Sequence, residues 1–241
     1  MSVNYEEIDY QTTPLGDLIL RRRRMSQLGD LDIYEVILGD DFLMTSLFHE
    51  AEYQLSKLGL NLAIGKDLDV VIGGLGLGYT AMSALEDDRV ESLVVVEYLE
   101  AVIGWHQKGL VPLGNQLLDD ARCKLSHSDF FGDSARTGKG FDPDYPEKKH
   151  DVILLDIDHT PTNLLHQTNA RFYSAEGLKE LRTHLNPRGV FAMWADGVPD
   201  ESFTQTLNGV FDSAASHTIE FENPITGGTS KGTVYVAQIQ T

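Results

Sequence analysis

The stretch DVVIGGLGLGYT at 69–80, followed by LVVVE at 93–97, decides the fold of this chain. An apolar strand runs directly into alternating glycines and then into a helix, as in the first crossover of nucleoside-binding α/β proteins. Because glycine has no Cβ, Gly74, Gly76 and Gly78 allow a sharp turn and a close approach of the backbone to a ligand. The segment therefore predicts a ligand site over the glycine turn.

The spacing of the glycines indicates which ligand the turn would hold. A dinucleotide fingerprint requires G-x-G-x-x-G, but counting on from Gly76 puts Tyr79 where close packing of helix and strand needs Gly or Ala. Glu97 ends the next strand, where an acidic side chain commonly accepts hydrogen bonds from ribose hydroxyls. We therefore expect S-adenosylmethionine or a relative rather than NAD, with Leu75 and Tyr98 among its contacts.

The composition indicates a soluble enzyme of one main domain. At 241 residues and 41% hydrophobic content, the chain can bury a full core. Cys123 is the only cysteine, which excludes an internal disulfide and a multi-cysteine metal site, and we expect no metal. The N-terminal MSVNYEEIDY has no apolar region, and no run approaches the roughly 20 apolar residues of a membrane span. We therefore expect a cytoplasmic protein that does not bind membranes.

The charge is strongly acidic, with 37 Asp plus Glu against 19 Lys plus Arg and a net charge of −18. Nucleic acid is disfavoured as a partner because phosphate contacts need a basic surface. A cationic small-molecule substrate would be attracted instead. The alternative, that the acidity only maintains solubility, stays open because a net charge identifies no site.

From residue 68 onward, strands and helices alternate, which predicts an α/β fold with a doubly wound, mostly parallel Rossmann-like sheet. The C-terminal HTIEFENPITGGTSKGTVYVAQIQ predicts an antiparallel hairpin at the sheet edge. We expect strands near 68–73, 92–97, 123–127, 151–156 and 189–194, and helices near 78–86, 99–110, 130–136 and 174–185.

A small N-terminal β cap precedes this sheet. The segments 16–25 and 32–46 are rich in strand formers, and a helix is expected over 46–58. We divide the chain into the cap with this helix, residues 1–60, and a nucleoside-binding catalytic domain, residues 61–241. Because the cap is too small to bury both of its faces alone, we expect a homodimer.

His49 and Tyr53 lie four residues apart on the predicted helix, beside its buried stripe. A polar side chain on that face could point into a cleft and contact a substrate. A histidine on such a helix is more often structural, so that alternative stays open.

Several carboxylates follow the predicted strands at their carboxyl ends, where open α/β sheets bind ligands. Asp129 could accept the adenine amino group while Phe130 packs on the base; the alternative is that Asp129 caps the following helix. Asp156 and Asp158, with His159 beside them, end an apolar strand, where two carboxylates are costly unless they bind a cation or move a proton. Solvation of these side chains in a loop is the alternative.

These features together resemble the spermidine synthase family of polyamine aminopropyltransferases, especially its compact bacterial branch, from about residue 14 to the C-terminus. The resemblance is carried by the β cap before Phe48-His49-Glu50, VVIGGLGLGYT, Glu97, Asp129, DVILLDID and the terminal hairpin. It implies a sheet of the class I methyltransferase type. It also implies that Glu97 holds ribose, that Asp129 holds adenine and that Asp156 deprotonates the attacking amine.

The same resemblance places further residues at the acceptor. His49 corresponds to a polar residue near the substrate in the family's Tyr-His-Glu segment, with Phe48 in place of Tyr. The family's Asp-Ser-x-Asp-Pro motif reads Asp156, Ile157, Asp158, His159, Thr160 here, so Asp158 and His159 are expected to bind the acceptor.

One departure affects the reaction. The synthases have Gly-Gly-Gly-Asp-Gly-Gly, whose Asp binds the aminopropyl ammonium, and Gly76 stands at that position. The main hypothesis is transfer of an aminopropyl group from decarboxylated S-adenosylmethionine to a polyamine or related amine. An S-adenosylmethionine-dependent small-molecule methyltransferase is the alternative favoured by Gly76. A catalytically silent nucleoside-binding protein is the alternative favoured by the changed second acidic motif.

Overall fold

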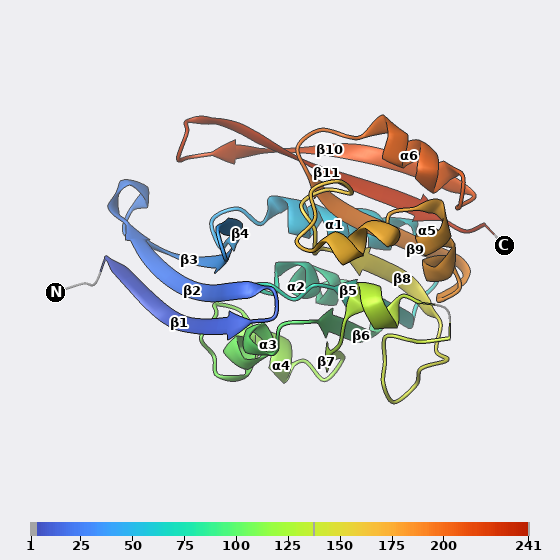
Figure 1. Ribbon diagram of the computed structural model, residues 1–241, viewed down its shortest axis with the longest axis horizontal. Coiled ribbons are helices and arrows are strands. Elements are labelled where there is room, and N and C mark those ends of the chain that lie inside the picture. The colour runs from blue at the N-terminus through green and yellow to red at the C-terminus, as the bar shows by residue number, and fades with distance from the viewer. Residues whose placement is uncertain (1–3, 137, 241) are drawn as a thin grey trace.

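The computed structural model describes residues 4–136 and 138–240, and in these ranges the strands form two sheets (Figure 1). The smaller sheet consists of β1 (Tyr5–Thr13), β2 (Gly16–Met25), β3 (Leu31–Leu38) and β4 (Asp41–Thr45). The larger sheet consists of β5 (Leu68–Gly73), β6 (Val90–Glu97), β7 (Cys123–His127), β8 (His150–Leu155), β9 (Leu185–Asp196), β10 (Ser213–Asn223) and β11 (Gly228–Gln238). The α-helices are α1 (Glu50–Leu62), α2 (Tyr79–Leu85), α3 (Glu100–Gln107), α4 (Gly114–Asp119), α5 (Ala175–Arg182) and α6 (Glu201–Asn208). No helix in the described ranges is long and apolar enough to cross a membrane.

The larger sheet has the strand order β10-β11-β9-β8-β5-β6-β7. Strands β5 to β9 pair in parallel, whereas β11 pairs antiparallel with both β9 and β10. This arrangement confirms the predicted α/β fold of the class I methyltransferase type, with a hairpin at one edge. Because the strand order reverses between β5 and β8, ligands of such sheets bind at the carboxyl ends of these two strands.

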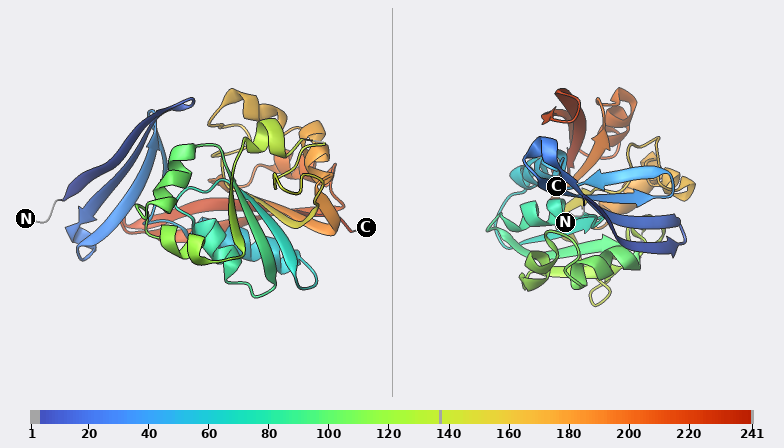
Figure 2. Two further views of the ribbon diagram at one scale, coloured as in Figure 1. Left: turned by 90° about the horizontal axis from the view of Figure 1, so that it is seen from below. Right: turned by 90° about the vertical axis from the view of Figure 1, so that its left-hand side faces the viewer.

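The apolar strands divide their side chains between two cores. In β5, Val70 and Ile72 are buried with side chains of α1, α2 and α3, whereas Val71 is buried with side chains of α5 and α6. Neighbouring side chains of a strand point to opposite faces, so a strand covered on both faces needs a continuous apolar run. Leu18 and Leu38 of the small sheet belong to the first of these cores. Figure 2 shows the small sheet at one end of the molecule, beside the larger sheet.

The helix predicted over 46–58 was wrong at both ends, since α1 spans Glu50–Leu62. Residues 46 and 47 lie in a turn, Phe48 forms a β-bridge with Thr45, and His49 has non-helical angles of φ −142° and ψ 11°, so the helix begins only at Glu50. His49 therefore precedes the helix and does not share a helical face with Tyr53.

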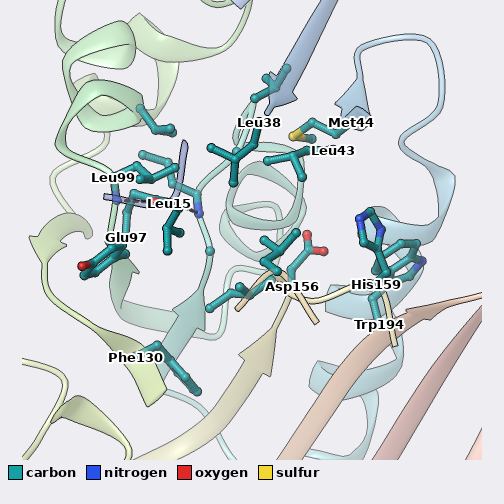
Figure 3. A pocket seen from close by; sticks show the side chains of 18 of the residues that line it. Leu15, Leu38, Leu43, Met44, Glu97, Leu99, Phe130, Asp156, His159 and Trp194 are labelled. Atoms are coloured by element: carbon teal, nitrogen blue, oxygen red, sulfur yellow. Dashed lines mark hydrogen bonds between the residues drawn. The ribbon is translucent and has the colours of Figure 1, made fainter. Parts of the chain in front are cut away.

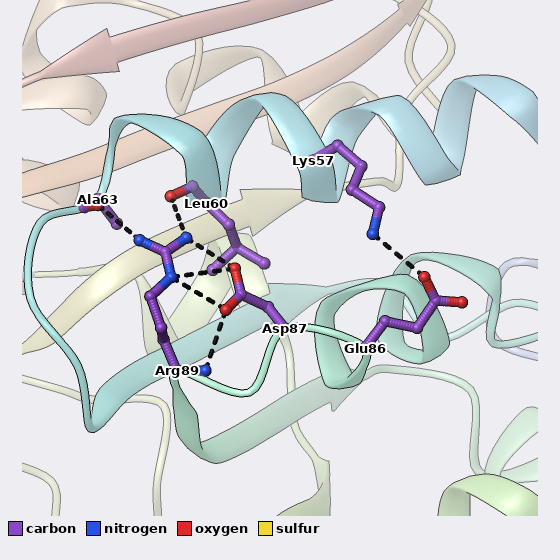
Figure 4. Close-up of polar contacts among 6 residues, drawn as sticks. All are labelled: Lys57, Leu60, Ala63, Glu86, Asp87 and Arg89. Atoms are coloured by element: carbon purple, nitrogen blue, oxygen red, sulfur yellow. Dashed lines mark hydrogen bonds and ion pairs between the residues drawn. The ribbon is translucent and has the colours of Figure 1, made fainter.

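The C-terminal end of α1 is held by an arginine from a neighbouring loop (Figure 4). Arg89 donates hydrogen bonds to the carbonyl oxygens of Leu60, at 2.9 Å, and Ala63, at 3.0 Å. Asp87 fixes the same guanidinium through an ion pair of 2.6 Å. The last carbonyl groups of a helix have no partner within the helix, so this arginine fixes the position of α1 on the larger sheet.

Glu35 in β3 is 2% exposed and receives hydrogen bonds of 2.6 Å from both Arg21 and Arg23. Burial raises the pKa of this carboxyl, but the hydrogen bonds from the two arginines lower it more, so the net shift is downward. We expect Glu35→Gln to lower the free energy of unfolding at pH 7 by about 2 kcal/mol, as for the loss of charged hydrogen bonds. Urea unfolding measures this change.

The pH dependence of the stability that Glu35 contributes follows from the lowered pKa of its carboxyl. Because the folded-state pKa of Glu35 lies below its unfolded value of about 4.3, its contribution is present above that pH and is lost as the pH falls through the folded pKa. The difference between wild type and Glu35→Gln should therefore shrink at low pH. Glu6→Gln is the matched control, since its carboxyl is 47% exposed and pairs with Arg22 at the surface. An equal loss in both variants would contradict the prediction.

Candidate functional site

A cavity of about 540 Å³ lies between the small sheet and the carboxyl ends of β5, β6 and β8. In Figure 3, Glu97 and Phe130 lie on one side of it, Asp156 lies near the middle, and His159 and Trp194 lie on the other side. The cavity therefore brings together residues that follow several separate strands. Apolar side chains of the N-terminal segment cover it: Leu15, Leu38, Leu43 and Met44.

The glycine turn after β5 is tied to both neighbouring strands. The Gly74 amide donates to the Val96 carbonyl at 2.9 Å, and the Asp156 amide donates to the Gly73 carbonyl at 2.8 Å. Gly74 has a φ of +95°, and a Cβ there would lie closer than 3.0 Å to the Asp156 carbonyl oxygen. Only glycine fits this position, because both the backbone angle and the neighbouring strand exclude a side chain.

The other two glycines of the turn accommodate protein side chains. A Cβ on Gly76 would lie 2.5 Å from the Met44 sulfur, and a Cβ on Gly78 would lie 2.5 Å from Leu117 Cδ1. Gly74, Leu75 and Gly76 line the cavity, whereas Gly78 packs against α4.

His106 of α3 supports the turn and was missed by the sequence analysis. Its ring is buried, and because a carbonyl only accepts, its Nε2–H donates to the Gly76 carbonyl oxygen at 2.9 Å. Burial lowers the pKa of His106, which favours the neutral ring. A single histidine within a helix carries no sequence signal for this contact.

Glu97 lies at the end of β6, buried and facing the cavity. Its two carboxylate oxygens accept hydrogen bonds from the backbone amides of Leu75, at 2.9 Å, and Leu99, at 2.7 Å. Burial raises its pKa, and these amides act in the opposite direction. A carboxylate has about four lone-pair sites, so hydroxyl groups of a ligand still have sites to bind.

Asp129 lines the cavity and also caps the turn that follows it. Its Oδ1 accepts from the amides of Phe131, at 2.9 Å, and Gly132, at 2.7 Å. The helix expected over 130–136 is a single π-helical turn, Phe130–Ser134. Phe130 is almost fully buried under Gly73, while Tyr98 remains exposed; both line the cavity.

Asp156 follows β8 and lines the cavity together with a second carboxylate, Glu52. Thr80 of α2 donates a hydrogen bond of 2.6 Å to Asp156 Oδ2. Burial raises the pKa of both carboxyls, and the charge of Asp156 raises that of Glu52 further. Glu52 was not among the residues predicted for the site, whereas His49, which precedes α1, was.

Two residues that were predicted to bind the acceptor substrate, Asp158 and His49, lie outside the cavity lining. Asp158 is 1% exposed and accepts hydrogen bonds from the Leu165 amide at 2.7 Å, Asn169 at 3.0 Å and the Tyr173 hydroxyl at 2.8 Å. His49 stacks on Tyr79, with the ring centroids 4.4 Å apart. Neither Asp158 nor His49 lines the cavity, whereas His159 does.

The cavity has an acidic lining. Its described lining contains five carboxylates and two histidines, but no lysine or arginine: Glu52, Glu97, Asp129, Asp156, Asp196, His159 and His166. No cluster of three or more His, Cys, Asp or Glu in the described ranges could hold a metal ion. The aromatic rings of Phe48 and Phe221, with centroids 5.8 Å apart, form part of the wall.

Solved structures share this architecture at low sequence identity. A spermidine synthase in complex with the transition state analogue AdoDATO matches with a TM-score of 0.73 and 16% identity, over 98% of this chain and 74% of that chain. The spermidine synthase from Thermotoga maritima matches with a TM-score of 0.70 and 17% identity, over 98% and 73% of the two chains. Human methyltransferase-like protein 13 in complex with SAH matches with a TM-score of 0.50 and 19% identity, over 78% of each chain.

No model of a protein family matches the chain, and no curated protein matches it by sequence. The expected resemblance is thus confirmed in three dimensions, including the β cap, which the spermidine synthase matches cover along with the larger sheet. The chain has the fold of the spermidine synthases, a variant of the class I methyltransferase-like α/β fold.

Proposed function

We propose that this protein is a transferase that uses an adenosyl sulfonium donor, and that it moves an aminopropyl group from decarboxylated S-adenosylmethionine to a polyamine or related amine. The observation that carries the proposal is the cavity lining, with five carboxylates and no lysine or arginine among its described residues. Decarboxylated S-adenosylmethionine and an amine acceptor are both cationic, and buried carboxylates are stabilised by such partners.

The donor would lie over the glycine turn. Glu97 accepts the ribose hydroxyls, Asp129 accepts the adenine amino group, and Phe130 and Tyr98 supply apolar contacts to the base. The glycine turn would contact the donor through Gly74, Leu75 and Gly76. The spermidine synthase solved with AdoDATO and the human methyltransferase-like protein solved with SAH have the same kind of fold, which supports an adenosyl ligand of this type.

Asp156 would act on the acceptor amine. A primary amine with a pKa of about 10 is protonated at neutral pH, and freeing its lone pair costs about 4 kcal/mol. Asp156 binds the ammonium and takes one of its protons, and the free amine attacks the carbon beside the sulfonium. The carbon–sulfur bond breaks with its electron pair on sulfur, which leaves methylthioadenosine. The cavity walls align donor and acceptor for this displacement.

Methyl transfer is the second candidate, and one observation favours it. At the position where the synthases carry the aspartate that binds the aminopropyl ammonium, a Cβ on Gly76 would lie 2.5 Å from the Met44 sulfur. Met44 therefore occupies the space of that aspartate, and a donor tail at this point meets an apolar side chain. His159 would bind the acceptor in either reaction.

Parallel product assays test the proposal. Decarboxylated S-adenosylmethionine and S-adenosylmethionine are each offered with putrescine, cadaverine and longer diamines, and release of methylthioadenosine and S-adenosylhomocysteine is followed. We expect methylthioadenosine from the decarboxylated donor. S-adenosylhomocysteine alone would make the protein a methyltransferase, and binding of methylthioadenosine without either product would make it a silent nucleoside-binding protein. Tighter calorimetric binding of NAD than of either adenosyl product would overturn the donor assignment.

A further inference from the structure

We propose that Glu52 is a second catalytic carboxylate, which binds the acceptor ammonium together with Asp156 and shares the proton that leaves it. This inference rests on the proposed amine acceptor. Glu52 lies in the first turn of α1 and lines the same cavity as Asp156. Within the described structure its carboxylate has no hydrogen bond or ion pair with the side chain of another residue, whereas Thr80 already binds one oxygen of Asp156. Glu52 is therefore free to bind a ligand.

The negative charge of Asp156 acts on the carboxyl of Glu52. Burial raises the pKa of both, and the charge of Asp156 raises that of Glu52 further, because two negative charges this close repel. Such a pair holds one proton between its members when no ligand is bound. A cation placed between them removes the repulsion and favours the doubly ionised pair.

Groups from several elements surround this pair. Tyr79 of α2 lines the cavity, and burial together with the charge of Glu52 raises its pKa, so it stays a neutral phenol. His159 and Asp196 also line the cavity, from the loop after β8 and the end of β9. Since the described lining has no lysine or arginine, a cationic ligand would supply a positive charge that compensates the carboxylates.

The proton follows a balanced path in this arrangement. The acceptor enters as R–NH₃⁺, and the pair, doubly ionised in its presence, takes one proton as the neutral amine attacks the carbon beside the sulfonium. The new carbon–nitrogen bond replaces the carbon–sulfur bond, whose electrons stay on the thioether. The product leaves as a secondary ammonium, and the proton on the pair returns to solvent. The raised pKa of Glu52 makes the pair a better match for an amine than an ordinary carboxylate with a pKa near 4.

The chain offers a matched control on the same helix. Glu50 lies two residues before Glu52, but its side chain is exposed and accepts a hydrogen bond of 2.8 Å from Gln54. Glu52→Gln and Glu50→Gln remove the same charge from the same helical turn. An effect of helix stability or of net charge would appear in both variants.

Kinetics with the amine acceptor give the first test. For Glu52→Gln we expect kcat/KM for the acceptor to fall about 10-fold or more, with unchanged affinity for methylthioadenosine, as for loss of a group that binds and deprotonates the amine. The acid limb of the pH–rate profile should move to lower pH, because Asp156 no longer faces a second negative charge. Glu50→Gln should match wild type in both measurements. A Glu52→Gln enzyme with the wild-type rate and pH profile would overturn the proposal.

A titration separates this inference from the proposed function. The side-chain carboxyl groups are labelled with ¹³C and followed by NMR against pH, in wild type and in Asp156→Asn, with and without cadaverine as the probe. We expect cadaverine to lower the pKa of Glu52 in wild type, and Asp156→Asn to lower it without any ligand. If the product assays find no transfer but cadaverine shifts Glu52, the reaction is wrong and the amine site stands. If transfer occurs and cadaverine leaves the pKa of Glu52 unchanged, the role of Glu52 is refuted.

Discussion

Asp156→Asn is expected to lower turnover about 100-fold or more, the usual contribution of a positioned general base. Asparagine keeps the size of the side chain and its contact with Thr80, but it neither attracts an ammonium nor accepts a proton from it. The affinity for methylthioadenosine should change little, because Glu97 and Asp129, which also line the cavity, would hold the nucleoside. Initial rates of methylthioadenosine release and calorimetric binding measure the two effects separately.

Asp119→Asn provides the control for charge, since Asp119 is exposed on α4 and lies outside the cavity lining. It should retain the wild-type rate. Full turnover by Asp156→Asn would remove this residue from the mechanism, and an equal loss in both variants would attribute the effect to the overall charge of the protein.

Gly74→Ala is expected to have the largest effect on the binding site itself. The added Cβ would lie closer than 3.0 Å to the carbonyl oxygen of Asp156, and the φ of +95° is one that alanine rarely adopts. Strands β5 and β8 would have to separate at the point where Asp156 begins its turn. We expect a loss of about 3 kcal/mol or more in the free energy of unfolding, together with loss of methylthioadenosine binding.

Gly65→Ala separates backbone strain from the steric clash. Gly65 has a similar φ of +102°, but a Cβ there would meet nothing within 4 Å. This variant should lose only about 1–2 kcal/mol, the cost of a left-handed conformation, and should bind methylthioadenosine normally. Urea unfolding and calorimetry of the two variants decide the point. Equal losses of stability would show that the contact with Asp156 has no special effect.

The sequence predicted the large sheet well because its signals are local. Each central strand is a short apolar run, and the glycine turn, Glu97 and Asp129 directly follow such runs, so their place at the sheet edge follows from the order of the strands. The predicted cap was confirmed for the same reason, since turns separate its strand-forming segments.

The residues around the acceptor amine could not be predicted from such local sequence signals. Asp158 follows β8 in sequence, yet it turns into the protein because Leu165, Asn169 and Tyr173, farther along the chain, donate to it. Glu52 lines the cavity from the first turn of α1, together with residues of the small sheet and of β9. These contacts depend on tertiary structure. The division at residues 60 and 61, the homodimer and the cytoplasmic location stay predictions.

The hydrogen bonds to Asp158 order one wall of the cavity, formed by Leu165 and Asn169, as the protein folds. Leu165 and Asn169 line the cavity and are held by hydrogen bonds to this buried carboxylate. Ordering a residue costs about 1–2 kcal/mol of conformational entropy, and here that cost is met during folding. A ligand therefore meets a preorganised wall, and its affinity is not reduced by the entropy of closing a loop.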